Sequence, residues 1–563
     1  MNTILPSILQ TICTRYPVYR LFLSQLIPAT VAVKDVAILP EQKLLSKLDI
    51  LYIYGLGSGK ICTLLESWLK NKIERHVIFI EDDFTCLANF LSSPYAHAIE
   101  NPRIHIRYIF DPLSLEEFCT QCASEFPMQY ISILSNKSGK EIFFERMKLL
   151  LFRHTTMQQA SMAECILYPK LLRNVYKNIH FISDITLGSS LKGQCKNIPA
   201  VICGGGPSLD ESISDLRKLQ HSALIFAGGS GITALTQQNI QPHICIAADP
   251  NQMEWNQLRE MNAFTAPMGF VPRVFSPIHA LHNGPLLYLQ MLSSGKIETM
   301  IEETLEFSKE YLWDVIHPYA NSVTTLAIAY ASFLGCNPLY LCGVDLAYTS
   351  GLVYADKVIN NNKMLTEDSD VGSTIIYEKG ILGEDIATAS KWTIEASWIS
   401  QFTQSYNHIK LYRASLQGLP IQGVSFQPLS TLFSSPKMDL EGRFFSLLQR
   451  KKKNYPIRKI KESIATIQKS AQRSYGLCKK IVEALQNNTE TSESEPVSVT
   501  LAILDLQQEE IYQKVFMDFH ERLTFFFNTI YPEHAGHALQ YIIWKNIEKN
   551  LEECVDVFSS TNV

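Results

Sequence analysis

Short apolar runs alternate with helical patterns along most of the chain, and this alternation predicts an α/β architecture. Near the start, apolar runs at residues 48–54 and 76–80 predict two strands, with an amphipathic helix from 61 to about 70 between them. Four more apolar runs predict buried strands at residues 200–203, 223–227, 244–248 and 339–342. Near-continuous apolar strands are typical of parallel sheets whose two faces are covered by helices. We therefore expect a mostly parallel, doubly wound central sheet.

The same patterns divide the chain into four parts. Residues 1–140 alternate strands and helices and predict a Rossmann-like N-terminal domain, whereas residues 141–194 are mostly helical and predict a connector. Residues 195–430 carry the four buried strands of a second α/β domain, in which we expect a nucleotide site. Long helical patterns predict a helical C-terminal region at residues 431–563. A chain of 563 residues is expected to hold more than one domain.

A glycine-rich loop separates the strand predicted at 200–203 from a helical apolar stripe that begins at Leu209. Ser208 and Glu211 have the spacing of a capping box, which places the start of the helix just after the glycines. A strand–glycine loop–helix unit directs backbone N–H groups and a helix dipole at one spot, which favours a phosphate. A tight turn without a ligand is the alternative. The residues of this loop are Gly204, Gly205, Gly206, Pro207 and Ser208.

Polar residues also follow the other three strands of this predicted sheet. Since the carboxyl ends of parallel strands share one edge, we expect them to converge on one cleft. Carboxylates there would hold sugar hydroxyls or Mg²⁺, and tyrosine hydroxyls would support a departing phosphate. The aspartates also fit ordinary turns, and the tyrosines also fit simple packing. In chain order these residues are Ser230 in a second glycine turn (228–231), Asp249, Gly343, Asp345, Tyr348 and Tyr354.

The N-terminal part has a glycine loop of its own, at residues 55–59, after the strand predicted at 48–54. Glu81 follows the next strand, as in nucleotide-binding βαβ units. The G-x-G-x-G spacing departs from both the dinucleotide fingerprint and the P-loop. Two interpretations therefore remain open: a cofactor site, and a Rossmann-like scaffold that binds no cofactor.

The composition indicates the compartment and the classes of partner of the protein, but it says little about the reaction. A net charge of −5 gives no argument for nucleic-acid binding. Thirteen cysteines without framework spacing suggest a reducing compartment, and we interpret the Cys119 and Cys122 pair as helix packing. No run of 18 apolar residues predicts a transmembrane span, and the N-terminus lacks the pattern of a signal peptide. We expect a cytoplasmic protein.

Taken in order, the motifs of the central region resemble those of the motility accessory factor (Maf) family. They are Cys203-Gly-Gly-Gly-Pro-Ser-Leu-Asp210, Ile246-Ala-Ala-Asp249-Pro, Asn321-Ser-Val-Thr-Thr-Leu-Ala327, Leu334-Gly335, Gly343-Val-Asp345-Leu-Ala-Tyr348-Thr and a segment from Gly380 to Trp392. The central domain of that family is of the type described as similar to 6-hydroxymethylpterin pyrophosphokinase (MptE-like). It is more distantly similar to bacterial sialyltransferases that use CMP-activated nonulosonic acids.

The resemblance implies roles for individual residues. The loop from Gly204 to Ser208 would contact CMP, Tyr348 and Tyr354 would assist its departure, and Ser322 would lie near the donor. The implied reaction transfers a nonulosonic-acid-like sugar to a protein hydroxyl, without a required cofactor.

Two departures from the sialyltransferase pattern concern catalysis. Residues 355–400 contain no histidine, although the sialyltransferases place their base after the tyrosines. The asparagine of their second turn is also missing, since Gly228-Gly-Ser230 stands there. A carboxylate could serve as base, and the sequence does not choose among Asp356, Glu378, Glu384 and Asp385.

Three functions remain open at this point. The first is a sugar transferase that uses a nucleotide-activated donor, with the helical C-terminal region suited to a protein acceptor. The second is a pyrophosphokinase that binds ATP in the same loop and holds Mg²⁺ on Asp249 and Asp345. The third is a non-catalytic scaffold that binds a nucleotide or a partner.

Overall fold

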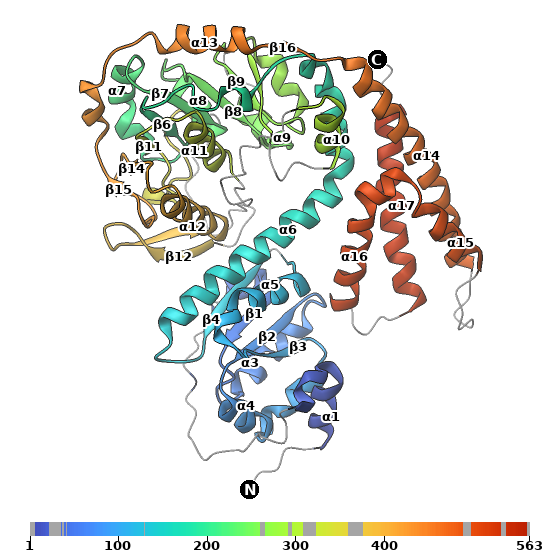
Figure 1. Cartoon of the computed structure of the whole chain (residues 1–563). Helices are drawn as coiled ribbons and strands as arrows, with labels where there is room; N and C mark the ends of the chain where they lie inside the picture. Colours follow the sequence, from blue (N-terminus) through green and yellow to red (C-terminus); the bar gives the residue numbers. More distant parts are fainter. Residues whose placement is uncertain are drawn as a thin grey trace.

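The computed structural model describes residues 6–21, 35, 39–40, 42–128, 130–258, 265–290, 296–307, 322–358, 375–487, 497–530 and 536–559 (Figure 1). Two α/β units are joined by one long helix, and a group of helices lies beside that helix. The predicted α/β class is confirmed, because both main sheets are built of parallel strands between helices.

The N-terminal unit is a four-stranded parallel sheet with the order β3-β2-β1-β4. Side chains alternate between its faces: Leu51 and Ile53 of β1 pack toward α1, α3 and α4, whereas Ile50 and Tyr52 pack toward α5 and α6. Cys119 and Cys122 are buried in the second of these cores, as helix packing requires. The elements are α1 (Pro6–Arg15), α2 (Gln42–Lys47), β1 (Ile50–Tyr54), α3 (Lys60–Lys70), β2 (His76–Glu81), α4 (Phe84–Leu91), β3 (Ile104–Tyr108), α5 (Leu115–Glu125) and β4 (Ile131–Ser135).

Most of the predicted connector is one helix, α6 (Glu141–Asn178), which runs from the N-terminal unit to the central one (Figure 1). Its first turns bury Met147 and Leu151 in the N-terminal core, and its last turns bury Leu172 and Val175 in the central core. The helix therefore belongs to both units.

The central sheet has ten strands in the order β15-β14-β11-β6-β7-β8-β9-β10-β5-β16. From β6 the chain proceeds strand by strand to β10, and then β11 returns to the other side of β6. The direction of winding thus reverses between β6 and β11, and such a switch point is where open α/β sheets bind ligands. The strands are β5 (Asp184–Leu187), β6 (Ala200–Cys203), β7 (Leu224–Gly228), β8 (Ile244–Ala247), β9 (Met268–Phe270), β10 (Leu286–Tyr288), β11 (Leu339–Cys342), β14 (Leu411–Arg413), β15 (Ser425–Phe426) and β16 (Lys453–Asn454).

Helices cover both faces of this sheet. Val201 and Cys203 of β6 face the core formed with α7, α8, α14 and α17, whereas Ala200 and Ile202 face α11, α12 and α13. The stripe that begins at Leu209 is buried throughout α7. A separate antiparallel hairpin, β12 (Ile375–Lys379) and β13 (Asp385–Ala389), leads into α12. The helices are α7 (Leu209–Leu219), α8 (Ser230–Thr236), α9 (Gln252–Leu258), α10 (Lys296–Thr304), α11 (Val323–Phe333), α12 (Ser390–Ser405) and α13 (Leu440–Lys451).

The sheet extends beyond the predicted limits of 195 and 430. β5 lies in the segment interpreted as connector, and β16 lies in the segment interpreted as helical. The two pair antiparallel at the sheet edge, with Ile185 opposite Lys453. Both predicted boundaries were wrong at these points, because short strands give too weak a pattern to stand out from their helical surroundings.

The C-terminal helices pack against one another and along α6. The contact between α14 and α17 is the most extensive among them, and α17 also lies against α6 (Figure 1). In the part of the chain that the structure describes, no helix combines the length and the apolar character that crossing a membrane requires. These helices are α14 (Ile457–Asn487), α15 (Val497–Leu506), α16 (Met517–Ile530) and α17 (His537–Ser559).

Candidate functional site

The glycine loop after β6 packs closely against the chain that leaves β11, at the switch point of the sheet. Gly204 N–H donates to the Cys342 carbonyl at 2.8 Å, and Gly206 N–H donates to the Gly343 carbonyl at 2.8 Å. A Cβ on Gly204 would lie 2.4 Å from the Gly343 oxygen, so only glycine fits there. Two of the three glycine amides predicted to hold phosphate are thus used within the protein. Gly205 N–H makes no hydrogen bond with any residue that the structure describes.

Ser208 lies where α7 begins, as predicted, but it does not form a capping box. Its hydroxyl donates to Asp345 instead, and its N–H donates to the same carboxylate at 2.9 Å. The predicted box with Glu211 is therefore wrong: the Glu211 carboxylate accepts from Gln417. A carboxylate outcompetes the local cap because it accepts both donors of Ser208 at once.

Asp345 is 2% exposed and also accepts from the Thr349 hydroxyl at 3.1 Å. Burial raises its pKa, although the Ser208 and Thr349 hydrogen bonds and the nearby Arg413 oppose the shift. This carboxylate faces the start of α7 and holds the glycine loop in place. Its predicted catalytic role stays a prediction.

The second glycine turn lies against the first. Gly229 has φ 49° and ψ −125°, a backbone conformation that favours glycine. A Cβ on Gly205 would lie 2.2 Å from the Ser230 hydroxyl oxygen, so the two glycine turns touch. A Cβ on Gly228 would lie 2.1 Å from Val323 Cγ1, so the start of α11 packs against the second glycine turn.

Tyr348 and Tyr354 lie together beside the glycine loop. Ala355 N–H donates to the Gly205 carbonyl at 2.9 Å, which draws the tyrosine segment to the loop. The Tyr348 ring packs against Trp392 with 4.7 Å between ring centroids. Burial, and secondarily Tyr354, raise the pKa of Tyr348, so its hydroxyl remains a neutral donor. That hydroxyl makes no hydrogen bond with a residue that the structure describes, and Tyr348 is 4% exposed.

Ser322 caps α11, as its predicted position at the start of that helix requires, and it has a partner that sequence reasoning missed. Its hydroxyl oxygen accepts from Thr325 N–H at 3.1 Å and donates to Glu395 Oε1 at 2.6 Å. Glu395 lies on α12, one turn after Trp392. Burial raises the pKa of Glu395 to about 7. The sequence offered one signal: Glu395 lies in the segment 355–400, in which a base was sought.

The structure does not bring Asp249 and Asp345 together. β8 and β11 are separated by β6 and β7, so the ends of these two strands lie roughly 14 Å apart. Asp249 Oδ1 accepts from Asn251 N–H at 2.8 Å and from its amide group at 2.9 Å, as in an ordinary turn. Mg²⁺ binds its ligands at about 2.1 Å, so one ion does not fit between these carboxylates.

Of the four carboxylates considered as bases, three lie beside a lysine and one lies at a hairpin turn. Glu378 pairs with Lys148 of α6 at 2.8 Å, and Asp385 pairs with Lys379 at 2.8 Å. Asp356 is exposed and lies 3.5 Å from the ammonium of its neighbour Lys357. Glu384 lies at the turn of the β12–β13 hairpin, with its carboxylate against Gly380.

The N-terminal glycine loop is filled by the protein itself. Asp35 accepts from Ser58 N–H at 2.9 Å, from the Ser58 hydroxyl and from the Asn136 amide at 3.2 Å. Lys137 forms ion pairs with Glu81 and Asp82. Glu81 also accepts three backbone N–H groups, so the acidic residue that would hold a ribose is satisfied within the protein. This arrangement favours the scaffold interpretation of the N-terminal sheet.

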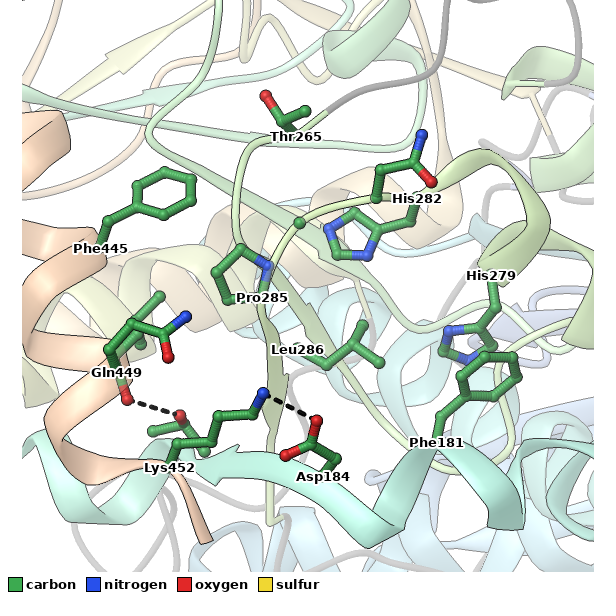
Figure 2. Close-up of a pocket in the computed structure, with 14 residues that line it drawn as sticks. Phe181, Asp184, Thr265, His279, His282, Pro285, Leu286, Phe445, Gln449 and Lys452 are labelled. Atoms are coloured by element: carbon green, nitrogen blue, oxygen red, sulfur yellow. Dashed lines mark hydrogen bonds and ion pairs between the residues drawn. The ribbon is translucent and has the colours of Figure 1, made fainter. Parts of the chain in front are cut away.

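A cavity of about 640 Å³ lies elsewhere, at the amino ends of β5 and β10 (Figure 2). His279 stacks on Phe181 in its wall, with 4.1 Å between ring centroids, and Lys452 pairs with Asp184 at 2.7 Å. The glycine loops of the central domain lie at the opposite, carboxyl edge of the sheet, so this cavity is separate from the candidate nucleotide site.

Comparisons with known proteins agree with the motifs. Residues 173–351 match the family described as 6-hydroxymethylpterin diphosphokinase MptE-like. Among solved structures, the chain is similar to a Maf glycosyltransferase from Magnetospirillum magneticum AMB-1, with a TM-score of 0.50 and 15% identity over 97% of this chain and 87% of that one. No curated protein sequence matches the chain. At this identity the structural likeness establishes a shared fold. The family match supports the MptE-like part of the resemblance inferred from the motifs over residues 173–351, and the structural likeness shows that the chain shares the fold of the Maf glycosyltransferase.

Proposed function

We propose that this chain is a glycosyltransferase-like protein that binds a CMP-activated, nonulosonic-acid-like sugar and transfers the sugar to a hydroxyl of a protein acceptor. The observation that carries the proposal is the convergence of both glycine turns with Tyr348 at the switch point of the central sheet. The fold shared with a Maf glycosyltransferase supports it.

The residues around the two glycine turns have distinct roles in this proposal. Gly205 N–H and the Ser230 hydroxyl bind the phosphate of CMP, with Gly204, Gly206, Pro207, Ser208 and Gly343 shaping the loop. The Tyr348 hydroxyl, with Tyr354 beside it, donates to the leaving phosphate as negative charge develops on it. Asp345 holds the loop that presents these donors. The C-terminal helices receive the protein acceptor.

A diphosphokinase is the second candidate function, because the matching family is described as diphosphokinase MptE-like. That reaction would use ATP, and the pair of carboxylates considered for Mg²⁺ does not converge on one ion. The geometry therefore favours the transferase. A diphosphokinase of this chain would need another set of Mg²⁺ ligands.

Titration calorimetry with CMP, CDP and ATP, each with and without Mg²⁺, tests the proposal. We expect CMP to bind without metal. Binding of ATP alone, with a strict need for Mg²⁺, would replace the transferase by the diphosphokinase. If none of the three binds, a scaffold without a nucleotide site remains.

Hydrogen exchange locates the bound nucleotide without any substitution. We expect CMP to slow amide exchange at residues 204–208, 229–231 and 343–355. The N-terminal loop at 55–59 is the internal control and should not change, since Asp35 fills it. Protection confined to the N-terminal loop would refute the proposed location.

A further inference from the structure

The sequence alone did not select a proton acceptor for the proposed transfer, and the structure offers Glu395 as a candidate. It projects from α12 toward the start of α11, where the Ser322 hydroxyl donates to Glu395 Oε1 at 2.6 Å. The same hydroxyl oxygen accepts the Thr325 N–H, so the capping box at the start of α11 fixes the serine. The serine hydroxyl thus positions one oxygen of the Glu395 carboxylate.

Two contacts of neighbouring residues place Glu395 near the proposed nucleotide site. Val323, the residue after Ser322, packs against Gly228 at the second glycine turn. Trp392, one helical turn before Glu395, packs against Tyr348. The neighbours of Glu395 and of Ser322 thus contact the tyrosine assigned to the leaving group and the second glycine turn, and Glu395 is partly exposed.

The surroundings of Glu395 suit a group that exchanges a proton near neutral pH. Burial raises its pKa to about 7, while the Ser322 hydrogen bond and the charge of Lys391 oppose the shift. Lys391 lies on α12 itself, and α11 contributes the neutral Ser322. On α6, which packs against α12, Lys148 pairs with Glu378. A general base is most effective when its pKa lies close to the working pH.

We propose that Glu395 is the general base of the transfer reaction, an inference that rests on the function proposed above. The acceptor hydroxyl gives its proton to the Glu395 carboxylate, and its oxygen forms the new bond to the anomeric carbon of the donor. The bond between that carbon and the phosphate oxygen breaks, and its electron pair leaves with CMP. The Tyr348 hydroxyl stabilises the departing phosphate by a hydrogen bond.

The variant Glu395→Gln tests the role, with CMP-N-acetylneuraminic acid as the donor probe, water as the acceptor and release of CMP as the signal. We expect the rate to fall about 100-fold or more while CMP affinity stays within about twofold. The wild-type rate should rise with pH through about 7, and this dependence should vanish in the variant. Glu395→Asp should retain part of the activity.

Glu116→Gln is the control, because Glu116 lies on α5 of the N-terminal unit and pairs with Arg153. It should keep the wild-type rate. An unchanged rate in Glu395→Gln would overturn the proposal. The proposal would also be overturned if the rate of CMP release fell strongly in an amide variant of one of the other carboxylates and not in Glu395→Gln. Those carboxylates are Asp356, Glu378, Glu384 and Asp385.

A carbon NMR titration of glutamate carboxyl groups gives a readout that does not need turnover. The Glu395 signal, assigned by its absence in Glu395→Gln, should titrate near pH 7 and shift when CMP is added. A signal that titrates in the ordinary range and ignores CMP would refute the assignment. If CMP does not bind the wild type, the proposed function is refuted. If CMP binds but the Glu395 signal does not respond, only the role of Glu395 is refuted.

Discussion

Asp345, just beyond β11, accepts both the backbone N–H and the hydroxyl of Ser208, at the start of α7. The two residues are 137 positions apart in the sequence. Their contact closes the switch point of the central sheet and sets the position of the glycine loop. A single buried carboxylate thereby couples the two halves of the proposed nucleotide site.

Asp345→Ala should loosen this loop. The substitution leaves the Ser208 N–H and hydroxyl and the Thr349 hydroxyl without their acceptor, and an unpaired buried donor costs about 1–3 kcal/mol. We expect faster amide exchange at residues 204–212 and weaker CMP binding. Asp385→Ala, which removes an exposed ion pair with Lys379, should change neither. Unaltered exchange in Asp345→Ala would contradict the role of Asp345 as the anchor of the loop.

Tyr348→Phe should lower the reaction rate without lowering the stability of the fold. Phenylalanine keeps the ring contact with Trp392, so stability should change little. Loss of a donor to a leaving phosphate should lower the rate of CMP release about 100-fold. Tyr377→Phe serves as control, since Tyr377 is 72% exposed on the hairpin. A Tyr348→Phe protein with the wild-type rate would remove Tyr348 from the reaction.

Glu302→Gln should make the central domain more stable at alkaline pH. Glu302 is 4% exposed, and burial raises its pKa from 4.5 to about 7. Because the folded-state pKa is the higher one, this group supports folding fully below pH 4.5 and loses that contribution as the pH rises through 7. Above pH 7 the wild type should be less stable than the variant by on the order of 3 kcal/mol.

Urea denaturation of wild type and Glu302→Gln at pH 5 and pH 8 measures this difference. Tyr288 can still donate to the glutamine, as it does to Glu302 Oε1 at 3.1 Å. The stability gap should therefore widen toward pH 8. A gap of equal size at both pH values would show that Glu302 does not titrate as its burial predicts.

Asp35→Ala should open the N-terminal glycine loop without affecting the central site. Burial works against ionisation of Asp35, but hydrogen bonds from Ser58 and Asn136 prevail and lower its pKa. Removing the carboxylate should speed amide exchange at residues 56–60 and leave CMP affinity unchanged. Glu66→Ala, on the exposed face of α3, is the comparison variant. Reduced CMP binding in Asp35→Ala would move part of the nucleotide site to the N-terminal unit.

The sequence by itself determined the local elements. The apolar runs at 200–203 and 339–342 coincide with β6 and β11, and the stripe from Leu209 coincides with the buried face of α7. The glycine loops follow their strands as predicted. Burial of apolar side chains and the freedom of glycine act over a few neighbouring residues, so both leave a readable pattern.

Only the tertiary structure decided which groups meet. Strand order placed Asp345 against Ser208 and kept Asp249 three strand positions away. Packing of α12 on α11 joined Glu395 to Ser322, although 73 positions separate them. Hydrogen-bond partners of this kind depend on how strands are ordered and helices packed, and a one-dimensional pattern of apolar and polar residues does not contain that order.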